Sequence, residues 1–239
     1  MSNHLTCVGR YRGRESLCLA IALLALPLAA CATAKTAQPT EATATSVNTA
    51  VPTTQSSAEP ATSQNLRLVL RSAAEVNAAK QASESPIAQP LAGDLWQVLA
   101  IDSPQQLRFV SATDLDQLKL STGDAVALGL QNALAALPPL PTVTHDLTPH
   151  QIGVIQSNAD ETSRILTAKD WAPLARELDG RLLVAVPDCN TVLYSEENGT
   201  QSVRTFAAKA RDAAAQAGHA VSPAVLRWTP TGWQPVIVP

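Results

Sequence analysis

The sequence predicts an α+β fold, in which a mixed or antiparallel sheet packs against helices, after a disordered N-terminal tether. Three observations support this class. Short runs rich in β-favourable residues, such as LRLVL and LLVAV, recur along the chain. Segments with helical spacing of apolar residues, such as TGDAVALGLQNALAAL, lie between them. Residues 31–64 are rich in Thr, Ala, Ser and Pro and poor in large apolar residues, so they cannot form a core. The folded domain is therefore expected to span residues 65–239.

The first half of this domain is predicted to alternate strands and helices. LRLVL at Leu66–Leu70 forms a strand, and a short helix through Lys80 follows, because Ser72 and Glu75 have capping-box spacing. After a Pro-punctuated loop, LWQVLAI and QLRFV form a hairpin. In the helix TGDAVALGLQNALAAL, an apolar stripe faces the core and Pro138 ends the helix. The stripe consists of Val126, Leu130, Leu134 and Leu137.

Two segments, RFVSATDLDQL at 108–118 and RILTAKDWAPL at 164–174, have similar patterns. In each, an arginine and two apolar residues precede a hydroxyl residue, Ser111 or Thr167, and an aspartate follows three positions later. This pattern predicts a strand that ends at a helix cap. Two similar strand-helix halves explain the likeness, and independent convergence on the same strand-cap-helix pattern explains it about equally well.

The second half begins with a strand at IGVIQ, and LLVAV and TVLY form strands on either side of a Pro-Asp-Cys-Asn corner. Thr200 begins a helix that Gly218 ends. The packing face of this helix consists of Val203, Phe206, Ala207, Ala210 and Ala214. AVLRW and WQPVIV form a C-terminal hairpin with Trp228 and Trp233 at its end. For the four tryptophans of the chain, packing is favoured over a binding platform, because aromatic pairs stabilise hairpins directly.

The order of several segments resembles the YtpQ-like family of uncharacterised bacterial proteins. These segments are PLAGDLWQVLAIDSP, FVSATDLDQL with ALGLQNAL, LLVAVPDCNTVLY and AVSPAVLRWTPTGWQPV. The resemblance covers about Leu66–Val236 and implies an α+β domain, but it brings no established reaction, cofactor or catalytic residue. At the corner where that family has a sequence like Pro-Asn-Arg-Asp, this chain has Pro187–Asn190, Pro-Asp-Cys-Asn. A role of the corner arginine therefore does not transfer.

The first 30 residues have the anatomy of an export signal. Arg10, Arg12 and Arg14 precede the apolar run LCLAIALLALPLAA, which is shorter than the roughly 20 residues of a membrane-spanning helix. The LAAC motif that ends this run resembles the lipobox of bacterial lipoproteins. That resemblance implies that residues 1–30 are a lipoprotein signal peptide, cleaved before Cys31, and that the Cys31 thiol carries a lipid. An ordinary signal with a chance cysteine at its end is the alternative.

The predicted lipid sets the expected location and partners. Ala32 follows the cysteine where an aspartate would indicate inner-membrane retention in many Gram-negative bacteria, so we expect attachment to the outer membrane, facing the periplasm. The inner membrane is the alternative. Removal of residues 1–30 leaves 14 basic and 19 acidic residues, a net charge of −5. This balance gives no electrostatic basis for nucleic-acid binding.

Two places in the sequence are candidate sites. Cys189 is a candidate nucleophile, but Asp188 beside it opposes thiolate formation, so a hairpin-turn residue is favoured. In HDLTPH, His145, Asp146 and His150 suggest a metal, but the two histidines lack the four-residue spacing of a helical zinc pair. We therefore expect loop histidines and no metal or cofactor.

Two functions fit these observations. The first is a non-enzymatic envelope lipoprotein that binds a periplasmic protein, peptide or glycan, because the sequence has an anchor and a tether and no recognised catalytic constellation. The alternative is a periplasmic enzyme that uses Cys189 or a His-bound metal near residues 145–150.

Overall fold

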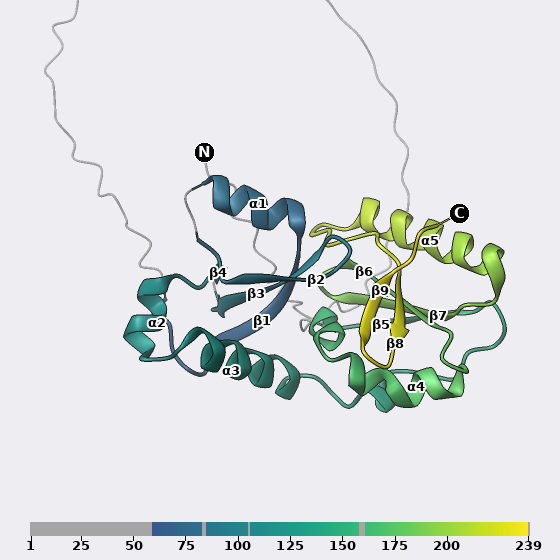
Figure 1. Cartoon of the computed structure of the whole chain (residues 1–239), viewed down its shortest axis with the longest axis horizontal. Coiled ribbons are helices and arrows are strands. Elements are labelled where there is room, and N and C mark those ends of the chain that lie inside the picture. Colours follow the sequence, from purple (N-terminus) through teal and green to yellow (C-terminus); the bar gives the residue numbers. More distant parts are fainter. Residues whose placement is uncertain (1–58, 83–84, 105, 158–160, 239) are drawn as a thin grey trace, which may run out of the picture. The chain divides into compact units, whose positions relative to one another are not determined.

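The computed structural model describes residues 59–82, 85–104, 106–157 and 161–238, which form two antiparallel sheets with helices on their faces (Figure 1). The predicted α+β class is confirmed. The predicted signal peptide and most of the predicted tether, including Cys31, lie outside the described residues. Glu59, the first described residue, already contacts the domain, since Arg108 donates a hydrogen bond to its carbonyl oxygen; the predicted boundary is Asn65. No helix in the described part of the chain is long and apolar enough to cross a membrane.

The first sheet is built on β3 (Leu95–Asp102), which pairs with β1 (Leu66–Ser72) on one side. Its other side pairs with β2 (Ala88–Ala92) and β4 (Leu107–Phe109). The strand at β1 and the β3–β4 hairpin are as predicted. β2 lies in the segment predicted as a loop, and Pro90 is tolerated there because β2 is at the edge of the sheet.

Helices cover both faces of the first sheet. α1 (Ala73–Gln81) is capped as predicted, with the Ser72 side chain accepting a hydrogen bond from the Glu75 backbone N–H. It buries Val76 against Val69 and Val98. The opposite face packs against α2 (Ala112–Leu118) and α3 (Thr122–Ala135).

The buried face of α3 differs from the predicted stripe. Its buried residues are Ala125, Gly129 and Ala133, whereas the predicted leucines and valine are only half-buried. A Cβ on Gly129 would lie 2.7 Å from Leu99 Cδ1 and 3.1 Å from the Arg67 backbone. The small residues therefore let α3 approach the sheet closely, and the larger ones flank this contact.

The second sheet has the strand order β5-β7-β6-β8-β9. Its strands are β5 (Ile152–Gln156), β6 (Leu182–Asp188), β7 (Thr191–Glu196), β8 (Leu226–Thr229) and β9 (Gly232–Pro235). All of these strands were predicted from the sequence, as were the β6–β7 and β8–β9 hairpins. Among the described strands, β5 pairs with β7 alone and is therefore an edge strand.

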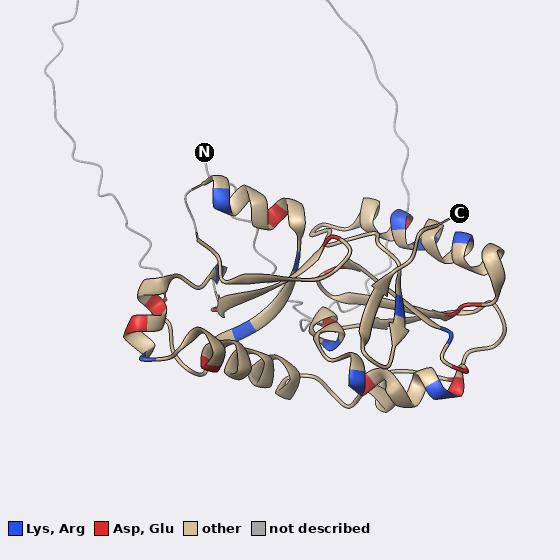
Figure 2. Ribbon diagram, viewed as in Figure 1, with Lys and Arg blue, Asp and Glu red and all other residues tan. Residues whose placement is uncertain are grey.

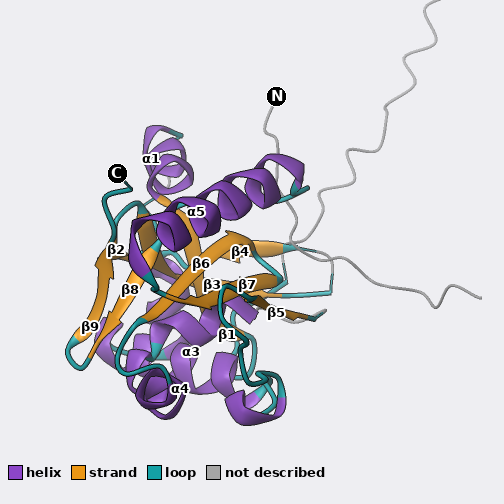
Figure 3. Cartoon of the chain, turned by 90° about the vertical axis from the view of Figure 1, so that its right-hand side faces the viewer, coloured by secondary structure: helices purple, strands orange, loops and turns teal. Residues whose placement is uncertain are grey.

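Helices also cover both faces of the second sheet (Figure 3). α5 (Gly199–Gln216) packs through Val203, Phe206, Ala207 and Ala210, as its sequence predicts, with Ala214 half-buried. The other face packs against α4 (Ala172–Glu177) and Trp171. Leu70 and Leu95 of the first sheet belong to the same apolar cluster, so the core is continuous between the two sheets.

The strand predicted directly before Thr167, at Arg164–Leu166, is wrong, because these residues do not form a strand. The chain makes two 3₁₀ helices instead, η2 (Glu161–Leu166) and η3 (Ala168–Trp171), and Thr167 makes no side-chain cap. Tryptophan contacts explain the difference, since indole N–H groups, two of them from the distant C-terminal hairpin, occupy backbone carbonyls that a strand would offer to a neighbour. Residues 164–174 therefore do not repeat the strand-cap-helix arrangement of residues 108–118.

Three tryptophans hold this 3₁₀ segment. The indole N–H groups of Trp171, Trp233 and Trp228 donate to the carbonyls of Arg164, Ile165 and Ala168 at 2.9, 2.6 and 2.7 Å. The rings of Trp171 and Trp233 also meet edge to face, with centroids 5.8 Å apart. These contacts attach the C-terminal hairpin to the 3₁₀ segment, so the tryptophans pack within the domain.

Candidate functional site: a groove beside the edge strand

The predicted thiol site lies at the β6–β7 turn. Cys189 is 2% exposed, and its Sγ lies 3.7 Å from the His219 carbonyl oxygen. The Asp188 side chain accepts a hydrogen bond from the Asn190 backbone N–H at 2.7 Å, which stabilises the turn.

The two predicted histidines lie in the loop before β5 and have different surroundings. The His145 backbone N–H donates to Tyr194 Oη at 3.0 Å, and its Nδ1 lies 3.1 Å from the same oxygen. His150 is exposed and has a left-handed backbone, with φ of 68°. The described residues contain no group of three His, Cys, Asp or Glu side chains placed to hold a metal ion.

These candidates do not meet in one cavity of the described structure. Cys189 lines a small cavity of about 80 Å³ with Arg71, Glu75 and His219, whereas neither His145 nor His150 lines it. Arg71 Nε and Glu75 Oε1 are 3.1 Å apart, and burial raises the pKa of Glu75 although Arg71 opposes the shift. The cavity has room for only a few water molecules, so it cannot enclose a substrate of ordinary size.

A larger open groove of about 570 Å³ lies where the end of α3, the following loop with η1 (Leu140–Thr142), and β5 meet. This volume is within the usual range of ligand sites. The described residues that line it are Ala136, Pro138, Val143, Val154, Ile155, Gln156, Ser157 and Glu161. Most of them are apolar, and four are consecutive, the last three residues of β5 and Ser157 directly after it.

β5 forms one edge of the groove, and all of its residues are uncharged. Its side chains alternate, with Gly153 and Ile155 buried and Val154 and Gln156 exposed; Val154 is 45% exposed. The strand contains no charged residue, as its uniform tan colour in Figure 2 shows, and it has no proline or bulge. Proteins commonly use those features to keep edge strands from pairing with other chains. β5 therefore remains competent to pair with a further strand.

Tyr194 fixes the position of β5 and of the loop before it. Its ring lies directly over Gly153, where a Cβ would come within 2.1 Å of Tyr194 Cζ. The Tyr194 hydroxyl accepts the His145 backbone N–H, so the tyrosine joins the loop to the sheet. Burial raises the pKa of Tyr194, and the hydrogen bond from His145 opposes the shift. His145 thus has a packing role in this arrangement.

The carboxylate in the groove wall is neutralised within the domain. Glu161 is 1% exposed and pairs with Arg164, with Nε and Oε2 2.5 Å apart. Arg164 Nη1 donates to the Pro138 carbonyl oxygen at 2.7 Å, which ties the loop after α3 to η2. The other described lining residues carry no ionisable side chain. The groove therefore offers a ligand no unpaired charge from these residues.

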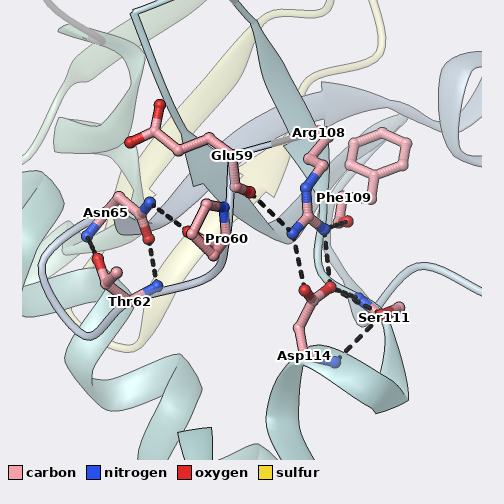
Figure 4. Close-up of polar contacts among 8 residues, drawn as sticks. All are labelled: Glu59, Pro60, Thr62, Asn65, Arg108, Phe109, Ser111 and Asp114. Atoms are coloured by element: carbon pink, nitrogen blue, oxygen red, sulfur yellow. Dashed lines mark hydrogen bonds and ion pairs between the residues drawn. The ribbon is translucent and has the colours of Figure 1, made fainter. Parts of the chain in front are cut away.

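A second polar cluster attaches the start of the domain to the first sheet (Figure 4). The two terminal nitrogens of Arg108 donate to the two carboxylate oxygens of Asp114, each at 2.7 Å. Asp114 also accepts from the Ser111 backbone N–H in a capping box, and Arg108 Nη2 donates to the Glu59 carbonyl oxygen. The hydrogen bonds from Arg108 hold the pKa of Asp114 far below its usual range. This cluster holds the segment from Glu59 onward on the domain.

No family model, curated protein or solved structure matches this chain. The YtpQ-like resemblance therefore stays a prediction from the order of the sequence segments.

The groove itself was not predicted from the sequence. Its walls come from residues 136–143, β5 and Glu161, which are separate in the sequence and are brought together only by the fold. The one local signal was IGVIQ, a short uncharged strand without proline, which is unusual for an edge strand. Nothing in that signal distinguishes an edge strand from a central one.

Proposed function

We propose that the protein is a non-enzymatic module of the bacterial cell envelope, anchored by a lipid on Cys31, that binds a protein or peptide partner in the groove beside β5. The observation that carries the binding proposal is the groove, an apolar hollow along an edge strand that lacks the usual protection against pairing. Exposed apolar hollows of this kind commonly mark interaction sites.

The LAAC motif and the preceding basic and apolar segments support the anchor. Ala32 after the cysteine supports the outer membrane, with the domain in the periplasm. The order of segments between Leu66 and Val236 supports membership of the YtpQ-like family. An enzyme built on Cys189 or on a metal at His145 and His150 lacks comparable support, because these residues line no common cavity in the described part of the chain.

The anchor is tested by Cys31→Ser in cells. We expect the wild-type protein to sediment with outer membranes and to carry acyl mass on its N-terminal cysteine, whereas the variant is released from the membrane. A variant that still sediments with outer membranes, together with a wild-type protein of unmodified mass, would contradict the anchor.

The binding site is tested by photo-crosslinking in cells, with a photoreactive amino acid at Val154. Ile237 is a matched control because it is also an exposed aliphatic residue, 92% exposed, and does not line the groove. We expect a discrete adduct from Val154 that is absent from Ile237. Equal adducts from both positions, or none from Val154, would refute the groove as the site.

A further inference from the structure

We propose that the occupant of the groove is an extended, uncharged peptide segment that pairs with β5 as an additional strand. This inference rests on the proposed function and names the class of its partner. It follows from three features of the groove, which are the direction of the β5 backbone groups, the apolar walls and the neutralised carboxylate.

The register of β5 determines which backbone groups face away from the sheet. The Ser157 backbone N–H donates to the Asn190 carbonyl oxygen at 3.3 Å and continues the β5–β7 register. In an antiparallel pair, the groups directed at the partner strand alternate along each strand. The N–H and C=O groups of Ile152, Val154 and Gln156 are therefore directed away from β7. A peptide in extended conformation satisfies such a row by main-chain hydrogen bonds.

The walls of the groove determine which side chains the added strand presents. Val154, with Ala136, Pro138 and Val143, forms an apolar surface beside the outward-facing backbone. Successive side chains of a strand point to opposite faces, so alternate residues of the added strand meet this surface. Small and β-branched aliphatic residues fit there, because they combine apolar surface with a preference for extended backbone.

The charges of the described lining residues favour an uncharged strand. Glu161 is already paired with the buried Arg164, and the remaining described lining residues are uncharged. A charged side chain that entered the groove would lose hydration without gaining a counter-charge from the described lining residues. Lysine and glutamate in the peptide should both be disfavoured, whereas a groove with a net charge would accept one of them.

The proposal is tested by fluorescence anisotropy with a labelled, end-blocked Thr-Val-Thr-Val-Thr-Val peptide and the protein purified from cells in mild detergent. Matched peptides carry lysine or glutamate in place of the central valine. We expect saturable binding of the uncharged peptide and at least about tenfold weaker binding of both charged peptides.

Variants of the protein separate backbone pairing from simple apolar contact. Val154→Pro removes one outward N–H and no hydrogen bond to β7, so it should weaken binding about tenfold while the domain stays folded. Val154→Thr keeps the backbone donor and a β-branched side chain, so it should bind nearly as the wild type does. Ala136→Phe provides a second test, because it fills the groove from the end of α3 without touching the β5 backbone.

The outcomes distinguish the inference from the function on which it rests. Binding that survives both Val154→Pro and Ala136→Phe, or that is equal for charged and uncharged peptides, overturns the strand proposal. If a discrete Val154 crosslink nevertheless forms in cells, the proposed function stands with a partner of another kind. A concentration-dependent dimer that Val154→Pro abolishes also overturns the proposal, because a second copy then occupies the groove. If the wild-type protein neither binds the uncharged peptide nor forms a Val154 crosslink in cells, both the strand proposal and the proposed function are refuted.

Discussion

The substitution Gly153→Ala tests the arrangement that holds β5 in place. The added methyl group would meet three atoms of the Tyr194 ring at 2.1, 2.3 and 2.6 Å, far inside normal contact distance. The ring is completely buried, so it has little space in which to move. Overpacking of this kind costs about 1–3 kcal/mol. If the ring shifts, the hydrogen bond to His145 is also weakened, which costs about 1 kcal/mol more.

The expected loss is therefore about 3 kcal/mol of unfolding free energy, measured by urea denaturation. For a domain of this size the melting temperature should fall by about 6–12 °C. Gly218→Ala is the matched control, since a Cβ there meets no atom within 4 Å, and it should be nearly neutral. The coupling is tested with Tyr194→Ala, in whose background the additional cost of Gly153→Ala should largely disappear.

A loss below about 0.5 kcal/mol for Gly153→Ala would refute the packing of Tyr194 over β5. An equal loss with and without Tyr194 would show that the glycine is required for another reason. Either result would remove the basis for treating β5 and the loop at His145 as one rigid wall of the groove.

Two other substitutions test the contacts that hold the rest of the domain. Asp114→Asn should lower the unfolding free energy by about 2–3 kcal/mol, because it leaves Arg108 without its carboxylate partner, and Asp116→Asn on the exposed side of α2 is the control. The folded-state pKa of Asp114 is depressed, so its contribution to the unfolding free energy is present above about pH 4 and is lost as pH falls further. Urea denaturation at a series of pH values should therefore show that the unfolding free energy of Asp114→Asn falls less steeply in acid than that of the wild type. Trp233→Phe removes the indole N–H that donates to Ile165 and should cost about 2 kcal/mol. The control is Trp96→Phe, because Trp96 is half-buried and makes no such contact with the described residues. If thermal unfolding showed the same loss of stability for both variants, the stabilising role of the Trp233 hydrogen bond would be contradicted.

Local patterns were sufficient for most of the fold. The β3–β4, β6–β7 and β8–β9 hairpins follow from β-favourable runs with short breaks, and the buried face of α5 follows from its helical spacing. Ser111 and Asp114 also behave as their spacing predicts, because a capping box depends on residues within one turn.

The failures involve contacts between distant segments. RILTAKDWAPL has the local pattern of a strand and a helix cap, yet the indole N–H groups of Trp233 and Trp228, from the C-terminal hairpin, take up the carbonyls of Ile165 and Ala168. The face of α3 was misassigned because Gly129 gains its importance from the closeness of β1 and β3, which periodicity does not show. β2 was missed because Pro90 is excluded from central strands and accepted at an edge.

The candidate site depends even more on the three-dimensional arrangement. The sequence drew attention to Cys189, His145 and His150 because of their reactive groups, and the structure places His145 on Tyr194 and Cys189 at a buried turn. Val154 and Ala136 carry no reactive group, so no motif marks them. Their significance arises because β5 is at an edge and the end of α3 lies beside it.

The central claim, that a partner occupies the outer edge of β5, is tested most directly by amide hydrogen exchange at Val154 and Gln156. We predict slower exchange at both amides when the protein is in native envelope membranes than after purification, with no change within β6. Equal exchange in the two preparations would contradict the account.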